Sequence, residues 1–299
     1  MHRPAAARVM TACLFAGLML TGAAFEASAA TRHIRHRHAS APGNMPALRS
    51  SSALVVDENT ASVLLSKQAD ASIPIASITK LMTALVVLDA QQPTNETIKL
   101  TAGDREVGKG AHSRLPTGAT LSRGDLMHLA LMSSENRAAH TLGNHYPGGL
   151  RACVAAMNEK ARSLGMNHTR FADPTGLSSQ NVASPEDLTK LVIAASQNPT
   201  IREYSTDDHY SVRVGRHSLQ FRNTDNLVAN PSWNIVVQKT GYTVDAGRCL
   251  VMKAIIEDRP IVIVLLDSYG KYTRIADAKR IRDWIHARAN ERVEHASTR

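Results

Sequence analysis

A serine and a lysine three residues apart open the part of the chain whose residue types most clearly suggest chemistry. Ser77 and Lys80 follow Pro74, and the apolar segment 81–88 comes directly after them. Pro74 favours an extended approach and the apolar run predicts a buried helix, so Ser77 and Lys80 lie one turn apart on one face. A lysine amine in a dry setting is disfavoured in its charged form and can accept a serine proton. Free N–H groups at the helix start would stabilise an oxyanion.

The pattern Ser-x-x-Lys is short, and alone it fits a helix cap and a solvated charge equally well. A second match, Ser268 to Lys271, follows the strand-like segment 261–266 and opens no apolar helix. The interpretation of Ser77 as a nucleophile therefore depends on two further motifs.

The first of these is Ser134-Glu135-Asn136, which lies in a gap between two helical segments. A connection at this position can direct a hydroxyl and an amide into a cleft. The second is Lys-Thr-Gly at residues 239–241, directly after the strand-like segment 234–238. It offers an ammonium, a hydroxyl and a glycine that permits close approach to the backbone. The three motifs in this order, each in the expected type of element, are typical of penicillin-binding proteins and class A β-lactamases.

The chain resembles the penicillin-binding serine DD-peptidases, and within them the small D-alanyl-D-alanine endopeptidases of the penicillin-binding protein 7 type. The resemblance covers roughly residues 50–290. Beyond the three motifs it includes the segments 74–83, 131–139, 221–224 and 233–241. Glu135 stands where the wider family more often has Asp, and this fits the subgroup better than a lactamase.

The resemblance implies a catalytic role for three side chains. Ser77 would attack a D-alanyl carbonyl and become the acyl-enzyme. Lys80 would take its proton, and Ser134 would relay a proton to the leaving amine. A Ser-His-Asp arrangement is disfavoured because neither His112 nor His128 is needed. No metal-ligand spacing such as His-Glu-x-x-His occurs, so no metal or cofactor is expected.

The resemblance also implies a set of substrate-binding residues. Asn136 would orient the substrate backbone. Lys239 would supply positive potential that keeps Lys80 neutral and attracts a carboxylate, which Thr240 would bind by a hydrogen bond. Gly241 leaves room beside the backbone, and the N–H of Tyr242 would share the oxyanion with the N–H of the nucleophile.

The distribution of predicted elements indicates an α+β fold. A strand hairpin at 53–57 and 61–65 opens the domain, and strand-like segments rich in β-branched residues return in the last third, at 211–214, 234–238, 249–256 and 261–266. Residues 258–260 are expected to turn between the last two strands. Helices lie between these groups, with starts expected at Ser122 and Ser184. We therefore expect a mostly antiparallel five-stranded sheet built from both ends of the domain, flanked by helices, with an inserted helical subdomain.

A terminal helix is expected to pack one apolar face on this sheet rather than on a membrane. That face comprises Ile275, Ala278, Ile281, Ile285 and Ala289.

The first fifty residues differ in character from the rest. Arg3 and Arg8 precede an apolar run that ends in Ala27-Ser28-Ala29, which predicts a secretory signal peptide at residues 1–29. Residues 30–50 form a basic, His-rich leader, residues 51–290 the peptidase domain and 291–299 a polar tail. More than half of the net charge of +9 lies in the first fifty residues, which contain six arginines and one glutamate. The body lacks a basic face with interleaved aromatics, so nucleic acid is not an expected partner.

Export predicts a periplasmic enzyme without a stable membrane anchor once the signal is cleaved. Two cysteines, Cys153 and Cys249, follow the signal. They could form a disulfide in an exported protein, but both lie in apolar segments, so two buried free thiols are at least as compatible with the pattern.

The resemblance implies peptidoglycan stem peptides as substrates and β-lactams as covalent inhibitors. Only 58 residues follow Gly241, too few for the extra β domain and anchor of the larger carboxypeptidases. This favours an endopeptidase that cleaves D-alanyl–meso-diaminopimelyl cross-links. The alternatives are a D-Ala-D-Ala carboxypeptidase, a β-lactamase using a carboxylate such as Asp173 or Glu186 for deacylation, and a non-catalytic wall-binding protein of the same fold.

Overall fold

The structure is a computed structural model and describes residues 45–104 and 113–297, with side chains up to residue 290. The expected signal peptide, the leader up to residue 44 and His112 lie outside the described residues. None of the helices within the described ranges is long and apolar enough to cross a membrane.

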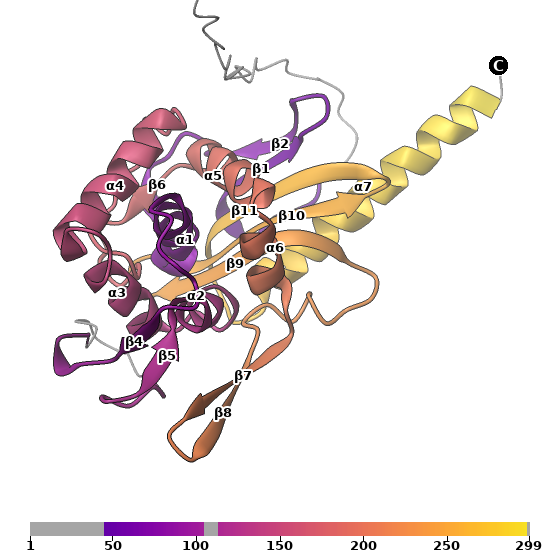
Figure 1. The fold of residues 1–299 in the computed structure, drawn as a ribbon. Helices are drawn as coiled ribbons and strands as arrows, with labels where there is room; N and C mark the ends of the chain where they lie inside the picture. Colours follow the sequence, from indigo (N-terminus) through magenta and orange to yellow (C-terminus); the bar gives the residue numbers. More distant parts are fainter. Residues whose placement is uncertain (1–44, 105–112, 298–299) are drawn as a thin grey trace, which may run out of the picture. The chain divides into compact units, whose positions relative to one another are not determined.

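A five-stranded sheet forms the centre of the domain (Figure 1). Its four pairings are all antiparallel. The first two strands come from the start of the domain and the other three from its end, so the predicted sheet is confirmed. The strand order is β2 (Ser62–Lys67), β1 (Ser50–Asp57), β11 (Arg259–Ser268), β10 (Gly247–Ile256) and β9 (Asn234–Thr243).

Both faces of the sheet are covered, which explains why its strands read as nearly continuous apolar runs. In β1, Leu54 and Val56 face the main core with the helices, whereas Ala53 and Val55 face a second core. The second core is closed by α7 (Thr273–Ser297), whose Ala278, Ile281 and Ile285 are buried. The expected packing of the terminal helix on the sheet is thus confirmed. The helix continues to Ser297, into the segment expected to be a polar tail.

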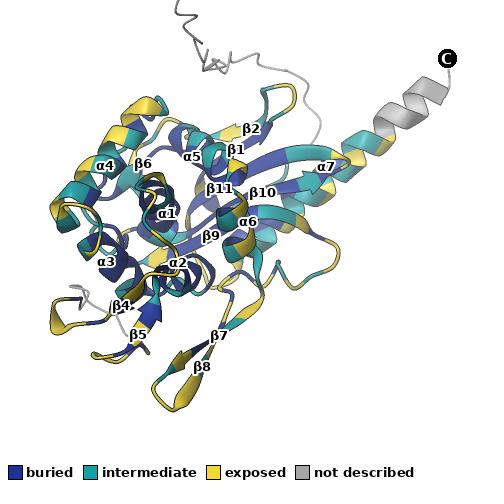
Figure 2. Ribbon diagram, in the orientation of Figure 1, coloured by how far each residue is buried: buried dark blue, intermediate teal, exposed yellow. Residues whose placement is uncertain are grey.

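Six α-helices between β2 and β9, counted over the described residues, form the inserted helical part. Figure 2 shows α1 among the most deeply buried, and all its residues from Thr79 to Val87 are buried. Ser122 and Ser184 cap α2 and α5 as predicted, the former with a complete capping box. The helices are α1 (Thr79–Asp89), α2 (Arg123–Met132), α3 (Asn136–Asn144), α4 (Gly149–Ser163), α5 (Pro185–Gln197) and α6 (Pro199–Thr206).

Three two-stranded ribbons lie outside the central sheet. They are β3 (Ile73–Pro74) with β6 (Val182–Ala183), β4 (Thr97–Lys99) with β5 (Thr120–Ser122), and β7 (His209–Val214) with β8 (His217–Arg222). The strand predicted at 211–214 therefore belongs to a separate hairpin and not to the main sheet.

The turn between the last two strands differs from the prediction. Glu257 and Asp258 form it, both with φ near +50°, while Arg259 and Pro260 already pair with β10. Two central residues with positive φ match the right-handed twist of a hairpin, so the turn is tighter than the proline suggested.

Cys153 and Cys249 are both free and buried. Burial raises the pKa of each thiol to about 12. The pair therefore remains as two protonated thiols within the core.

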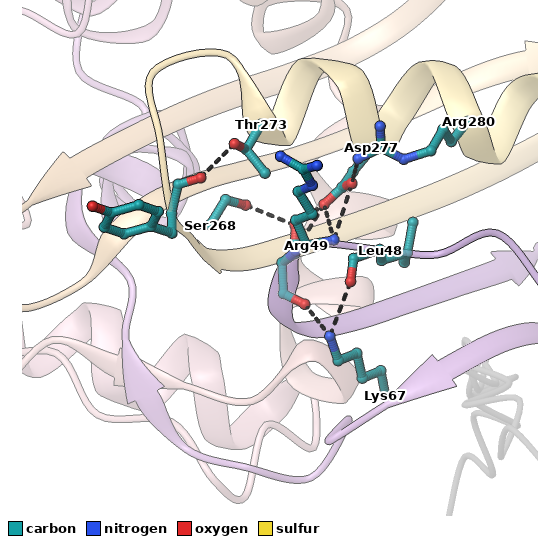
Figure 3. Close-up of polar contacts among 9 residues, drawn as sticks. Leu48, Arg49, Lys67, Ser268, Thr273, Asp277 and Arg280 are labelled. Carbon is teal, nitrogen blue, oxygen red and sulfur yellow. Dashed lines mark hydrogen bonds and ion pairs between the residues drawn. The ribbon is translucent and has the colours of Figure 1, made fainter.

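The two ends of the domain are joined by one buried carboxylate (Figure 3). Asp277 of α7 accepts hydrogen bonds from the N–H groups of Arg49 and Ser50 at 3.2 and 2.8 Å and from the Ser50 hydroxyl at 2.6 Å. Arg280 donates to the same carboxylate. Burial alone would raise the pKa of Asp277, but these hydrogen bonds outweigh burial and lower it.

This junction predicts how stability depends on pH. A carboxyl group whose pKa is lower in the folded state stabilises that state fully above the unfolded-state pKa of about 4. This stabilisation is lost as the pH falls through the folded-state pKa. We expect Asp277→Asn to lower the free energy of unfolding by about 2 kcal/mol at pH 7, with a smaller deficit at pH 3. Urea unfolding at several pH values measures this, with exposed Asp283→Asn on the same helix as control. A deficit independent of pH would contradict the assignment.

Candidate active site

Ser77 lies on a 3₁₀ turn, η1 (Ala76–Ile78), directly before α1. The α-helix begins at Thr79, two residues later than the motif suggested. Ala76 has φ +48°, an uncommon conformation for a residue with a side chain, and its carbonyl accepts the Thr79 hydroxyl at 2.8 Å. The nucleophile predicted from the sequence therefore lies on a tight, hydrogen-bonded turn at the mouth of a buried helix.

Lys80 connects the first two motifs. Its side chain is 1% exposed, and its Nζ lies 2.7 Å from Ser77 Oγ, 2.8 Å from Asn136 Oδ1 and 2.6 Å from the Thr175 carbonyl oxygen. Two of these partners are pure acceptors and take two N–H donors. In its neutral form the amine can direct a lone pair at the Ser77 hydroxyl proton, which is the arrangement a general base needs.

The carbonyl of Thr175 is held in place by its own loop. Asp173 Oδ1 accepts hydrogen bonds from the N–H and hydroxyl of Thr175 at 2.6 and 2.5 Å and from the N–H of Gly176 at 2.8 Å. Its other oxygen accepts from the Ser178 N–H at 2.9 Å. Asp173, which the sequence suggested for a lactamase reaction, is thus used to shape the loop that faces Lys80.

A buried asparagine attaches this loop to the helix of the nucleophile. Asn181 Nδ2 donates to Thr79 Oγ1 at 3.0 Å and to the Asp173 carbonyl at 2.9 Å, while its Oδ1 accepts from the Ala172 N–H at 2.6 Å. The turn that carries Ser77 and the loop that faces Lys80 therefore form one hydrogen-bonded unit. Glu186, the other carboxylate considered, lies in the first turn of α5.

Two glycines allow the backbone to close around Ser77. A Cβ on Gly176, which has φ +84°, would lie 1.9 Å from the carbonyl oxygen of Ala76. A Cβ on Gly241 would lie 2.9 Å from the carbonyl oxygen of Ile75 and 3.1 Å from the Ser77 nitrogen. Gly241 of the third motif thus lets β9 pack against η1. The sequence predicts only that this glycine leaves room for the substrate beside the backbone.

The middle motif occupies the gap between α2 and α3. Ser134 has φ +60°, and Asn136 is the first residue of α3. Glu135 caps α3, with Oε2 accepting from the Ala138 N–H at 2.9 Å, and it also accepts from the Ser113 hydroxyl. Ser134 and Asn136 line a cavity of about 530 Å³. Ser77 and Lys80 are not among the residues that line it.

Lys239 is completely buried, and its Nζ donates to the Thr240 carbonyl at 2.9 Å. Burial lowers its pKa well below the ordinary range, and the charge of Lys80 lowers it further, whereas Asp225 opposes the shift. Lys239 and Lys80 are thus electrostatically coupled, as the motif implied, but Lys239 itself is also driven toward its neutral form.

Asp225 and Arg274 are buried charged residues near Lys239 that the motifs did not identify. Asp225 accepts from the Leu227 N–H at 3.0 Å, and its other oxygen has no hydrogen bond within the described part of the chain. Burial raises the pKa of Asp225 to about 6, with Arg274 and Lys239 opposing. A carboxylate and a guanidinium from outside β9 are thus near enough to Lys239 to shift its pKa.

Thr240 and Tyr242 complete the third motif. Thr240 Oγ1 lies 2.6 Å from the hydroxyl of Thr224, so the segment after β8 runs beside β9. The Tyr242 ring is 55% exposed and lies 4.3 Å from the guanidinium of Arg248.

His128 is buried against the rings of Tyr204 and Tyr210, with centroids 4.4 and 3.9 Å away, and is a packing residue.

Comparison with known proteins agrees with the motifs. A family model described as D-alanyl-D-alanine carboxypeptidase, peptidase family S11, matches residues 37–270. The chain belongs to this family of DD-peptidases. It is 49% identical to a D-alanyl-D-alanine endopeptidase of Escherichia coli strain K12 over 249 residues, which is 83% of this chain and 80% of the relative. It is also 49% identical to a D-alanyl-D-alanine endopeptidase of Pseudomonas aeruginosa over 240 residues, 80% and 77% of the two chains.

The fold has solved counterparts. The crystal structure of the Streptomyces K15 DD-transpeptidase matches with a TM-score of 0.76 at 24% identity and covers 82% of this chain and all of that one. The predicted fold class and the resemblance to penicillin-binding DD-peptidases are confirmed.

The close approach at Gly176 gives a prediction for the site. We expect Gly176→Ala to displace the Ser77 turn and lower the rate of acylation by benzylpenicillin by about a hundredfold, because a methyl group cannot occupy a position 1.9 Å from an oxygen. Stopped-flow acylation measures this. Gly165→Ala is the matched control, since Gly165 has φ +69° with no atom within 4 Å of its Cβ position. Equal losses in both variants would show that backbone strain alone is responsible.

Proposed function

We propose that this DD-peptidase uses Ser77 as its nucleophile and hydrolyses D-alanyl–meso-diaminopimelyl cross-links of peptidoglycan. The observation that carries the proposal is the contact of Lys80 Nζ with Ser77 Oγ at 2.7 Å, in a buried position that also holds Asn136 and the Thr175 carbonyl. This geometry fits proton abstraction by a lysine.

In the proposed reaction Ser77 Oγ attacks the D-alanyl carbonyl carbon while its proton passes to Lys80 Nζ. The tetrahedral oxyanion is stabilised by the backbone N–H groups of Ser77 and Tyr242. The carbon–nitrogen bond then breaks, and the leaving amine receives a proton through Ser134. Water hydrolyses the resulting ester and regenerates Ser77.

Substrate binding is proposed for the remaining motif residues. Asn136 can bind Lys80 through its oxygen and present its N–H₂ group to the substrate backbone. Thr240 and the charge of Lys239 serve the carboxylate beside the scissile bond, and Gly241 keeps β9 close to the Ser77 turn.

Two observations favour an endopeptidase over the alternatives. The relatives at 49% identity are named endopeptidases, whereas the carboxypeptidases of Streptomyces sp. strain K15 and Mycobacterium tuberculosis are 28% and 29% identical. A β-lactamase needs a carboxylate to activate the deacylating water, whereas the carboxylate of Asp173 accepts hydrogen bonds from Thr175, Gly176 and Ser178 of its own loop. The paired Ser77 and Lys80 likewise disfavour a non-catalytic wall-binding protein.

We further propose that the enzyme is exported through the predicted signal at residues 1–29 and acts in the periplasm. Its partners there are peptidoglycan stem peptides, and β-lactams acylate Ser77 as substrate analogues. The motif at Ala27-Ser28-Ala29 supports the cleavage position.

Digestion of purified cross-linked muropeptide dimers tests the reaction. We expect the mature enzyme to convert dimers to monomers, and Ser77→Ala to lose this activity by at least a thousandfold. A pentapeptide substrate assayed in parallel reports release of the terminal D-alanine. Release of D-alanine without any cleavage of dimers would contradict the endopeptidase and support a carboxypeptidase.

The buried charges behind Lys239 give a pH prediction. Above pH 6 the Asp225 carboxylate is charged and raises the pKa of Lys239. Asp225→Asn removes that charge, so the pKa of Lys239 falls further and its ammonium is lost at lower pH. We expect the alkaline limb of the pH profile for benzylpenicillin acylation to move to lower pH in this variant. Exposed Asp208→Asn is the control, and superimposable profiles for Asp225→Asn and the wild type would contradict the coupling.

A further inference from the structure

The cavity of about 530 Å³ beside the middle motif carries two arginines that the proposed reaction does not use. Arg114 and Arg222 line it together with Ser134, Asn136 and Phe221. Arg222 ends β8, and the adjoining segment is attached to the end of α2 by the hydrogen bond from Thr224 N–H to the Met132 carbonyl at 3.1 Å. The cavity is therefore continuous with the site residues Ser134 and Asn136.

Arg114 is held in position by its neighbours. The Ser113 hydroxyl donates to Glu135, and Arg137 donates to the Leu115 carbonyl, so the residues on both sides of Arg114 are attached to α3 or its cap. The Arg114 guanidinium lies 3.9 Å from the centroid of the buried Phe221 ring. A cation stacked on an aromatic ring loses little further freedom when it binds an anion.

The charge of the cavity is positive. Among the described residues, neither Arg114 nor Arg222 forms an ion pair with an acidic side chain, and both are exposed. Glu135 also lines the cavity, but one of its oxygens accepts from Ser113 and the other from the Ala138 N–H at the start of α3. Two arginines thus line the cavity, and a guanidinium can offer paired donors to a carboxylate.

We propose that this cavity binds the free carboxylate of the diaminopimelyl residue in the acyl-donor stem through Arg114 and Arg222. The free diaminopimelyl carboxylate of the acceptor stem lies beside the scissile bond, where Thr240 and Lys239 are proposed to bind it. The inference rests on the proposed function. Diaminopimelate has two carboxyl groups, and in a stem peptide one of them is available as a free anion. The subsite therefore selects cross-linked peptides by charge, at a position separate from Lys239 and Thr240.

Amidated substrates test this subsite directly. Cross-linked dimers are prepared with the diaminopimelyl carboxylate free, amidated in the acyl-donor stem, or amidated in the acceptor stem. We expect amidation of the donor stem to lower the kcat/KM of the wild type about tenfold, and Arg114→Gln and Arg222→Gln to lose that discrimination. Amidation of the acceptor stem removes the carboxylate beside the scissile bond, so it should slow the wild type and both arginine variants alike.

Two controls separate this inference from the proposed reaction. Arg216→Gln, in the turn of the same hairpin and outside the cavity lining, should discriminate like the wild type. Benzylpenicillin should acylate both arginine variants at the wild-type rate, which shows that the Ser77 centre is intact. Equal cleavage of the unmodified and the donor-amidated dimers by the wild type, or undiminished discrimination between them in both arginine variants, would overturn the subsite alone. Cleavage of none, with acylation intact, would overturn the endopeptidase and the subsite with it.

Discussion

The three hydrogen bonds of the buried Lys80 amine are the constraint on which the rest of the site depends. They join Ser77, Asn136 and the Thr175 carbonyl, which lie up to 98 residues apart in the sequence. A buried amine with two carbonyl-type acceptors satisfies its N–H groups without needing a positive charge. The third partner is then the hydroxyl that must lose its proton.

The surrounding architecture keeps these partners in place. Asp173 and Asn181 fold the loop that presents Thr175, and the same asparagine binds Thr79 at the start of α1. On the other side β9 approaches the Ser77 turn closely enough that Gly241 has no room for a side chain. The central sheet holds β9 in this position through its pairing with β10. The hydrogen bond between Ser50 and Asp277 attaches α7 to β1 of the same sheet.

The side chains of the site could largely be predicted from the sequence, because motifs record residue types that carry chemistry. Ser77 and Lys80 lie in contact, as their spacing predicts, and Asn136 accepts a hydrogen bond from Lys80 that the motif did not predict. Thr175 could not be predicted, since it contributes a backbone carbonyl that any residue possesses. Asp225 was missed because its role depends on burial beside Lys239, which is a property of the fold. The proline in 258–260 pointed to a longer turn, whereas the positive φ of Glu257 and Asp258 made a two-residue hairpin.

The most direct measurement is mass spectrometry of the mature protein over time after brief exposure to benzylpenicillin, with peptide mapping. The account predicts a covalent adduct on the peptide that contains Ser77, persisting for minutes, and no adduct in Lys80→Ala over the same interval. An adduct on another serine, or an equally rapid adduct in Lys80→Ala, would contradict the proposal that a buried neutral lysine activates Ser77.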